Sequence, residues 1–329
     1  MKLLEMTGSA TSRLIDADPP KPAPGEVIIE TARSAICGSE MKTYRGTGMT
    51  GGNSGHEAVG TVLELGEGVT SPQIGQRVGV SAVVGCGDCS ECTRGQYTWC
   101  KSARSRSRMH AEQFAIHARA CSPLPDDLPW DEATLLTGDG MGVPWHTAKK
   151  IDRADVETIV VIGLGPIGLG NVLMQAHVGR RVIGVDIIDY RVRFARQLGA
   201  DVSIHADETL IEQIMDLTKG GGADVVIDCA GKRASVANSF LSVRRGGIVV
   251  FNGESMEELL APSRDFNRRE VWAVGCWYYF MSEVPEMFAL WRDGLDVAKM
   301  ITHQVPLHDA PAAFELFNRG QTGKVLLRP

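Results

Sequence analysis

The segment from Thr158 to Asp186 constrains the fold most, because it joins two strand patterns through a glycine motif and a helix pattern. It begins with the apolar run TIVVI, continues through G-x-G-x-x-G at residues 163–168 and a helix-compatible run, and ends with RVIGVD. A strand before the glycines, a helix after them and a second strand ending in an acid are what the dinucleotide fingerprint requires. The sequence therefore predicts a parallel, doubly wound sheet that binds a dinucleotide.

Each glycine of the motif has a separate expected role. Gly163 allows a tight turn, Gly165 lets the pyrophosphate approach backbone N–H groups, and Gly168 permits close packing of helix on strand. Pro166 and Ile167 complete the motif and open the helix, whose positive N-terminal end is expected to face the phosphates. We expect these five residues to bind the cofactor.

Asp186 ends the second strand, 18 residues beyond Gly168. A carboxylate at this place can bind both ribose hydroxyls of NAD and repel the additional phosphate of NADP. Arg191 follows closely and is expected either to cover the adenosine or to be a plain surface residue. The later runs ADVVIDCAG and GGIVVFNG predict further strands of the same sheet.

The stretch at residues 35–61 holds Cys37 and the triplet Gly55-His56-Glu57. Zinc accepts cysteine sulfur, histidine nitrogen and carboxylate oxygen, and a catalytic zinc keeps one position open. Asp139 lies between Gly138 and Gly140, so its carboxylate can approach a metal closely. An equally good interpretation from the residues alone is that Asp139 caps the helix that follows.

Four cysteines fall within 15 residues at the spacing C-x2-C-x2-C-x7-C. Four thiolates this close can complete a tetrahedral zinc shell with no open position, which is typical of a structural site. The alternatives are incidental clustering, a redox pair of cysteines and an iron–sulfur cluster. The four residues are Cys86, Cys89, Cys92 and Cys100.

Length and composition indicate a two-domain cytoplasmic protein. The chain has 329 residues and a formal net charge of −6, which argues against a nucleic-acid-binding surface. Arg104, Arg106 and Arg108 alternate in one short run, which we interpret as an exposed loop. The N-terminus lacks the apolar core of a signal peptide, and no run of 18 apolar residues predicts a membrane span.

Several other residues are interpreted as structural. His110, His117, His177 and His205 have no partner at ligand spacing. The run VWAVGCWYY at residues 271–279 predicts a strand, and its aromatic residues either pack in the core or, for Trp277, form the wall of a substrate pocket. Short strands between Gly and Pro turns in the first third of the chain suggest a small β barrel.

These motifs together resemble the zinc-containing medium-chain alcohol dehydrogenases, over nearly the whole chain. The resemblance implies an α/β protein with a GroES-like β-barrel catalytic domain at residues 1–139, including the zinc lobe at 86–100. It further implies a Rossmann NAD-binding domain at 140–278 and a return to the catalytic domain at 279–329. The matching segments are Cys37-Gly38-Ser39-Glu40, Gly55-His56-Glu57, the four-cysteine lobe, Gly163 to Gly168 with Asp186, and TGKVLL at 322–327.

The resemblance also implies roles for the residues of the site. Cys37 and His56 become catalytic zinc ligands, and Asp139 takes the place where the family commonly has Cys or Glu. Glu57 becomes a neighbouring carboxylate that can enter the metal shell, and Ser39 matches a proton-relay hydroxyl.

Three further positions are interpreted through the same resemblance. Glu40 stands where the family often has an acid that supports the ligand histidine. Lys42 occupies the position of a relay histidine, and Val143 replaces a threonine that often contacts the nicotinamide.

The expected function is a reversible, NAD-dependent oxidation of a secondary, polyol or sugar-derived alcohol to a ketone or aldehyde. Two zinc ions per chain and a homodimer or homotetramer are expected with it. The alternatives are an NAD-binding regulatory module with a decayed catalytic zinc site, and a zinc-independent enone or quinone reductase. The complete set of Cys37, His56 and Asp139 favours the first function over both.

Overall fold

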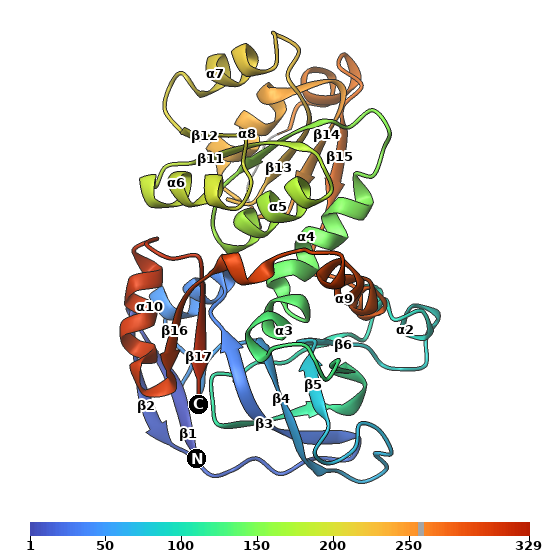
Figure 1. Cartoon of the computed structure of the whole chain (residues 1–329), viewed down its shortest axis with the longest axis vertical. Coiled ribbons are helices and arrows are strands. Elements are labelled where there is room, and N and C mark those ends of the chain that lie inside the picture. Colours follow the sequence, from blue (N-terminus) through green and yellow to red (C-terminus); the bar gives the residue numbers. More distant parts are fainter. Residues whose placement is uncertain (256–259) are drawn as a thin grey trace. The chain divides into compact units, whose positions relative to one another are not determined.

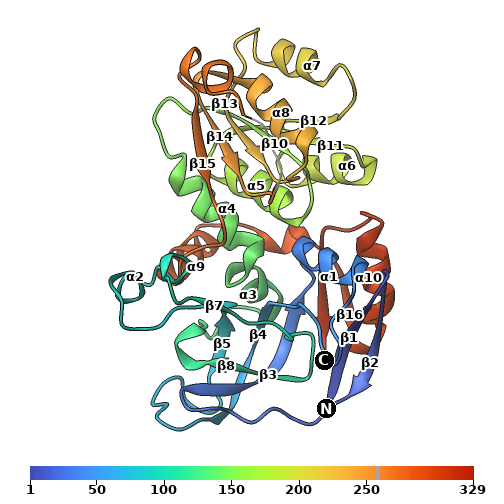
Figure 2. The ribbon, with the colours of Figure 1, turned by 180° about the vertical axis from the view of Figure 1, so that it is seen from behind.

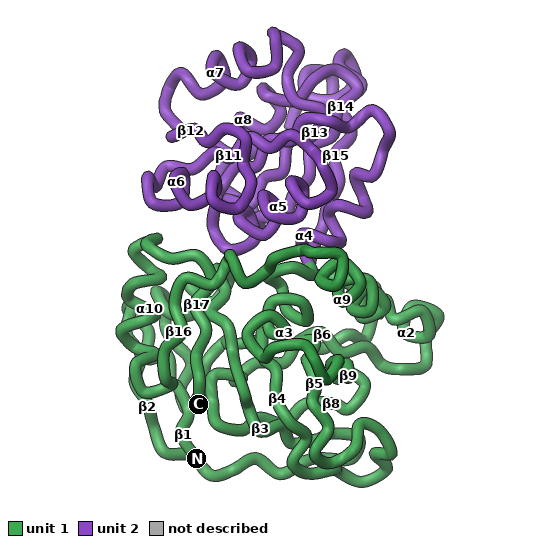
Figure 3. The backbone as a smooth tube through the Cα atoms, in the orientation of Figure 1, with its two compact units in different colours: residues 1–142, 279–329 green, residues 143–278 purple. Residues whose placement is uncertain are grey.

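The chain forms two compact units in the computed structural model, which describes residues 1–255 and 260–329 (Figure 3). Unit 1 comprises Met1–Gly142 together with Tyr279–Pro329, and unit 2 comprises Val143–Tyr278. The chain therefore begins unit 1, builds unit 2 as one continuous insertion and then returns to complete unit 1.

Unit 1 is built on a seven-stranded sheet in the order β16-β17-β3-β4-β5-β9, with β8 also paired to β3. Its long central pair, β3 and β4, is antiparallel and carries two register shifts that bend the strands. The strands of the unit are β1 (Lys2–Gly8), β2 (Thr11–Asp16), β3 (Glu26–Ala35), β4 (Glu57–Leu65), β5 (Arg77–Val80), β6 (Val83–Val84), β7 (Arg104–Ser105), β8 (Gln113–His117), β9 (Cys121–Pro123), β16 (Ile301–Pro306) and β17 (Lys324–Arg328).

Strand β17 brings the returning segment next to the strand that leads into Cys37. It pairs antiparallel with β3 through Leu326 and Leu327, and the backbone N–H of Ile36 donates to the Val325 carbonyl at 3.0 Å. Four of the five residues of β17 are buried, so the strand is covered on both faces. Its sequence therefore shows no regular alternation of apolar and polar residues.

The β1–β2 hairpin packs with α1 and α10 around an apolar cluster of unit 1 (Figure 2). Tyr44 and Phe314 meet there with ring centroids 5.4 Å apart. The helices of unit 1 are α1 (Met41–Arg45), α2 (Ser90–Thr93), α3 (Trp130–Leu136), α9 (Val284–Arg292) and α10 (Ala310–Asn318), and α4 (Asp139–Lys150) contains the point where the chain passes into unit 2.

Unit 2 is a six-stranded parallel sheet in the order β12-β11-β10-β13-β14-β15. Right-handed crossovers place α5 and α6, which lead outward from β10, on one face of the sheet and α8 on the other (Figure 1). The elements are β10 (Thr158–Ile162), α5 (Pro166–His177), β11 (Arg181–Asp186), α6 (Asp189–Gln197), β12 (Val202–His205), α7 (Leu210–Leu217), β13 (Ala223–Asp228), α8 (Arg233–Ser242), β14 (Val243–Phe251) and β15 (Trp272–Gly275).

The strand predicted over residues 271–279 is shorter than expected. β15 ends at Gly275, and Tyr278 has a left-handed backbone with φ of 60°, which an extended strand does not allow. Tyr278 and Tyr279 are buried, whereas Trp277 is 53% exposed. Among the described residues, no helix has both the length and the apolar character needed to cross a membrane.

Candidate metal centre and dinucleotide site

Cys37 lies two residues beyond the end of β3, at the start of a tight turn formed by Gly38–Glu40. Its side chain is 3% exposed. The backbone N–H of Cys37 donates to Glu40 Oε1 at 2.8 Å, and Ser39 Oγ donates to Cys37 Sγ at 3.4 Å. The strand and the turn together fix the direction of the thiol, while Ser39 itself remains exposed.

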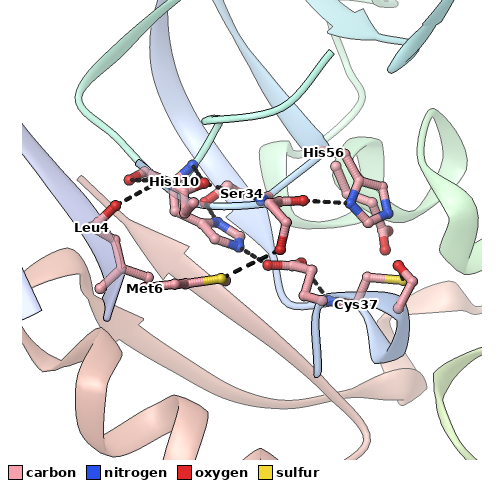
Figure 4. Close-up of polar contacts among 12 residues, drawn as sticks. Leu4, Met6, Ser34, Cys37, His56 and His110 are labelled. Carbon is pink, nitrogen blue, oxygen red and sulfur yellow. Dashed lines mark hydrogen bonds and ion pairs between the residues drawn. The ribbon is translucent and has the colours of Figure 1, made fainter. Parts of the chain in front are cut away.

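His56 immediately precedes β4 and is oriented by its own backbone. Its Nδ1 lies 2.9 Å from the carbonyl oxygen of Ser54, and a carbonyl only accepts, so Nδ1 carries a proton. This contact leaves Nε2 as the nitrogen able to bind a metal. Figure 4 shows the His56 ring and Cys37 in the same region of unit 1.

Asp139 is the first residue of α4 and meets both of these side chains. Its Oδ2 lies 3.1 Å from His56 Nε2 and 3.7 Å from Cys37 Sγ. Its other oxygen, Oδ1, is buried and has no hydrogen-bond partner among the described residues. A buried carboxylate oxygen without a partner is costly unless it has a further ligand, so this donor set fits a divalent metal.

Glu57 belongs to the same group, since one ligand atom from each of Cys37, His56, Glu57 and Asp139 lies within 4.8 Å of the others. Its carboxylate is already engaged: Oε1 accepts from Lys324 Nζ at 2.5 Å. Both side chains are completely buried. A fully buried lysine is rare unless it is paired. Lys324 and Glu57 therefore fix each other's position.

The electrostatics of this group also favour a bound cation. Burial and the charge of Glu57 raise the pKa of the Cys37 thiol. Burial lowers the pKa of the His56 imidazole, but Asp139 and Cys37 outweigh it and hold that pKa well above its usual range. A divalent cation such as zinc stabilises acidic groups that are crowded into a poorly solvated site.

The four-cysteine lobe forms a second, separate cluster in unit 1. Its four Sγ atoms lie within 4.8 Å of one another, and those of Cys86 and Cys92 are 3.9 Å apart, too far for a disulfide. Hydrogen bonds from the backbone of Asp88 and Cys89 lower the pKa of Cys86 to about 6. The backbone of Cys92 lowers the pKa of Cys89, but burial and the neighbouring thiols outweigh it and raise that pKa to about 12. Four sulfur donors at this distance from one another fit a closed, four-coordinate zinc site.

The glycine motif of unit 2 has the geometry that its spacing predicts. Gly163 has φ of 91°, and a Cβ on Gly168 would lie 1.8 Å from the Gly163 carbonyl oxygen, so both positions require glycine. A Cβ on Gly165 would meet nothing within 4 Å. No described protein atom therefore fills the space beside Gly165, at the start of α5.

Asp186 lies at the end of β11 with its carboxylate turned toward the glycine loop. Its Oδ2 accepts from Leu164 N at 2.6 Å and its Oδ1 from Ile188 N at 2.9 Å, while Arg191 Nη1 lies 3.6 Å from Oδ2. Arg191 is thus within ion-pair distance of Asp186. Each carboxylate oxygen keeps a further lone pair for a ligand hydroxyl.

The expectation that Glu40 supports His56 is wrong. Its carboxylate does not support the ligand histidine; it binds the Cys37 N–H and His110, whose Nε2 lies 2.8 Å from Glu40 Oε2. The imidazole of His56 is oriented by Ser54 instead. His110, which we interpreted as a structural residue with no partner at ligand spacing in the sequence, has the carboxylate of Glu40 as its partner.

Sequence reasoning did not identify Lys324 as part of the site. Lys324 stands in the TGKVLL ending. The one signal that could have identified it is a charged residue within an otherwise apolar strand pattern. Lys42, by contrast, is exposed, and so are Arg104, Arg106 and Arg108.

Comparisons with known proteins agree with this architecture. Residues 23–126 match the family described as the alcohol dehydrogenase GroES-like domain, and residues 166–293 match the one described as zinc-binding dehydrogenase. The L-threonine 3-dehydrogenase of Coxiella burnetii (strain Dugway 5J108-111) is 29% identical, with 99% of each chain covered. That of Shewanella loihica is 29% identical, with 95% of each covered.

Solved structures resemble the whole chain as well. A protein from E. coli CFT073 described as a short chain alcohol dehydrogenase, complexed with NADH, has a TM-score of 0.88 at 25% identity, covering 100% of this chain and 99% of that one. An alcohol dehydrogenase from Thermus sp. ATN1 has the same TM-score of 0.88 at 24% identity, with 100% and 99% covered. The predicted fold class, a GroES-like domain combined with a Rossmann-like parallel sheet, is confirmed.

Proposed function

Because the chain belongs to the zinc-containing medium-chain dehydrogenase family, we propose that it reversibly oxidises a secondary alcohol to a ketone with NAD as hydride acceptor. The observation that carries this proposal is the buried group of Cys37, His56, Glu57 and Asp139 in unit 1. Fold alone does not assign chemistry, whereas a thiol, an imidazole and a carboxylate within one ligand sphere do.

We assign Cys37, His56 and Asp139 as ligands of a catalytic zinc, with Glu57 as a fourth candidate ligand that is held aside by Lys324. The cysteines of the 86–100 lobe hold a structural zinc. When bound, the catalytic zinc supplies Lewis-acid chemistry that lowers the pKa of the substrate hydroxyl, and NAD supplies the hydride acceptor. The residues that hold the two ions are Cys37, His56 and Asp139 for one, and Cys86, Cys89, Cys92 and Cys100 for the other.

Ser39 is the residue best placed to move the substrate proton. Its hydroxyl touches Cys37 Sγ at 3.4 Å, yet the residue is exposed. A hydroxyl can accept one proton while donating another, so Ser39 can pass the proton from the site toward solvent.

The cofactor assignment rests on the βαβ segment of unit 2. Gly163, Gly165 and Gly168 bring the pyrophosphate to the N-terminus of α5, where Pro166 and Ile167 begin the helix. Asp186 binds the adenosine ribose and disfavours the phosphate of NADP, and Arg191 lies beside it. The relative solved with NADH supports this choice of cofactor.

The substrate class follows from two lines of support. The relatives named L-threonine 3-dehydrogenase oxidise the 3-position of threonine by their name, and that position is a secondary alcohol. The second line is Asp139 as the third ligand, which resembles the ligand set of some bacterial secondary-alcohol dehydrogenases. The candidate substrates are therefore an amino acid such as L-threonine and uncharged diols, polyols or sugar alcohols.

The deciding experiment measures NADH formation by the zinc-loaded protein on a panel of alcohols. L-threonine, 2,3-butanediol, sorbitol and primary alcohols are compared at equal concentration, with NAD and NADP in parallel. We expect turnover of at least one secondary alcohol with NAD, together with about two zinc ions per chain. One zinc per chain and no turnover would instead support the NAD-binding regulatory module.

The assembly and location of the protein complete the proposal. We expect a homodimer or a homotetramer in the cytoplasm, where the unbridged thiols of the zinc lobe remain reduced. Sedimentation or light scattering of the zinc-loaded protein checks the oligomeric state.

A further inference from the structure

His110 lies at the centre of the contacts that join the two ligand-bearing segments of unit 1 (Figure 4). Its side chain is completely buried. Its Nε2 lies 2.8 Å from Glu40 Oε2, and its Nδ1 lies 2.8 Å from Ser34 Oγ. Both ring nitrogens are therefore used, which fixes the plane of the imidazole.

Through Glu40, His110 reaches the Cys37 turn. The two carboxylate oxygens of Glu40 have one partner each: Oε1 accepts from Cys37 N at 2.8 Å and Oε2 contacts His110. The Glu40 carboxylate thus connects the backbone of Cys37 directly to the ring of His110.

Through its ring face, His110 reaches the segment that carries His56. A Cβ on Gly55 would lie 2.5 Å from His110 Cδ2, so the ring packs directly on the backbone that precedes His56. Asn53 Oδ1 accepts from both Gly55 N, at 3.0 Å, and His110 N, at 3.3 Å. The backbone N–H of Met109 also donates to the Gly55 carbonyl at 3.1 Å.

A histidine that only filled the core would need partners for its two nitrogens but would not need to contact both ligand segments. Here one imidazole binds the carboxylate that orients Cys37 and packs against the residue next to His56. Geometry that is held from outside the ligand shell commonly controls how tightly a site binds its metal.

We propose that His110 is a positioning residue for the catalytic zinc, which fixes the Cys37 thiol and the His56 imidazole relative to each other through Glu40 and Gly55. This inference rests on the proposed assignment of Cys37 and His56 as zinc ligands. Neither Glu40 nor His110 touches the metal in this arrangement, so their effect reaches zinc only through the ligands.

The test compares three substitutions of His110 with a matched control. His110→Phe keeps an aromatic ring but removes both hydrogen bonds. His110→Gln can place an amide N–H where Nε2 stands and so keeps the Glu40 contact, whereas His110→Asn reaches only toward Ser34. His117→Gln is the control, because the ring of His117 also packs against a glycine, with a Cβ on Gly25 at 2.9 Å from its Nε2, but contacts no ligand segment.

Two readouts follow the metal rather than catalysis. One is the rate at which a chelator removes each zinc, with the zinc of the four-cysteine lobe as internal reference. The other is the visible absorption of cobalt loaded into the vacated catalytic site, whose sulfur-to-metal band reports the Cys37 bond. Thermal unfolding of each zinc-loaded variant shows whether the fold is retained.

We expect His110→Phe to weaken zinc at the catalytic site by about 10-fold to 100-fold and to shift the cobalt spectrum, with the reference zinc unchanged. His110→Gln should stay close to the wild type, His110→Asn should resemble His110→Phe, and His117→Gln should change neither readout. If His110→Phe does not fold, the comparison of His110→Gln with His110→Asn decides alone.

Wild-type behaviour of His110→Phe overturns the inference, as do equal effects of the Gln and Asn variants or an equal effect of His117→Gln. A wild-type protein that binds only one zinc overturns both this inference and the proposed function. Two zinc ions in the wild type with no effect of His110→Phe overturn this inference alone.

Discussion

Asp139 is the single residue on which the proposed zinc site depends most directly, since its Oδ2 contacts both other ligands. We predict that Asp139→Ala lowers the zinc content from about two ions to about one per chain. The value of kcat/KM should fall by about 100-fold or more, because the Lewis acid contributes several kcal/mol. Metal analysis and steady-state kinetics measure the two effects.

Asp139→Cys is the matched control, because a thiolate carries the same formal charge and also binds zinc. We expect it to retain about two zinc ions and part of the activity. Two zinc ions in Asp139→Ala would show that Asp139 only begins α4, as the helix-cap interpretation holds.

The buried pair of Lys324 and Glu57 leads to a second prediction for single residues. Removing the ammonium by Lys324→Met leaves a carboxylate buried and unpaired, which should destabilise unit 1 by about 3 kcal/mol or more. Adding Glu57→Gln removes that charge and should recover most of the loss. The unfolding midpoints of the wild type, both single variants and the double variant form the measurement.

A double variant no more stable than Lys324→Met would contradict the pairing, since the loss would then come from packing alone.

The structure also explains why this contact escaped prediction. The two residues stand 267 positions apart, and Glu40 and His110 stand 70 apart. Cys37 and His56 could be proposed as ligands because each stands beside a glycine in a short motif, and Asp139 was added through the family resemblance. Side-chain pairing across a sheet leaves no such local pattern.

At the scale of elements, the turn from β10 into α5 separates packing from ligand binding. Gly165→Ala meets no atom within 4 Å, and its backbone, with φ of −68°, suits any residue. We therefore predict unchanged thermal stability but NAD affinity weakened by about 10-fold or more, because the methyl group occupies the space of the pyrophosphate. Calorimetric titration with NAD and a thermal melt give the two values.

Gly168→Ala is the contrasting variant, because its methyl group would lie 1.8 Å from the Gly163 carbonyl oxygen. It should lower the melting temperature of unit 2 as well as NAD affinity. Equal stability of the two variants would contradict the packing role of Gly168.

Arg244 of β14 joins β13 to the segment that precedes β10, and we expect its ion pairs to make the stability of unit 2 depend on pH. It lies 2.5 Å from Asp224 of β13 and 2.6 Å from Asp155, ahead of β10. Hydrogen bonds from Arg153 and Arg244 lower the pKa of Asp155 to about 2. A lowered pKa contributes stability above the unfolded value, near 3.8, that is lost as the pH falls through about 2.

We predict that Arg244→Gln lowers the melting temperature of unit 2 at pH 7, and that this difference from the wild type shrinks between pH 4 and pH 2. Melting curves of both proteins across that range test the sign. A difference that grows on acidification would show that Arg244 stabilises the sheet without these carboxylates.

The elements themselves were largely predictable from the sequence. Apolar runs bounded by charged residues gave β10 and β11 their limits, and the glycines placed α5. The strand at residues 271–279 was overestimated because aromatic and β-branched residues favour extension, while the left-handed backbone of Tyr278 depends on the tertiary structure around it.

For the whole molecule, the two proposed zinc ions should differ in what their loss does. Cys100→Ser removes one sulfur from a lobe of short, irregular segments, so we predict loss of the structural zinc and a lower melting temperature. The catalytic zinc should remain, because the lobe shares no ligand with Cys37, His56 or Asp139. Zinc analysis and melting of the variant check both statements.

Loss of both ions in Cys100→Ser would show that the two sites do not fold independently. The expected division into domains, including the return of the chain to the first domain, came from the family resemblance. No local pattern at residues 301–328 indicates which earlier strand this segment pairs with.

The discontinuity of unit 1 has a consequence for how the protein is made. A ribosome produces Cys37, His56 and Asp139 first, then all of Val143–Tyr278, and only afterwards β17 with Lys324. Unit 2 is continuous and can fold while translation proceeds, whereas the nascent first segment waits for its final strand. During that interval Glu57 has no countercharge, so capture of zinc by the finished site is expected to follow synthesis of β17.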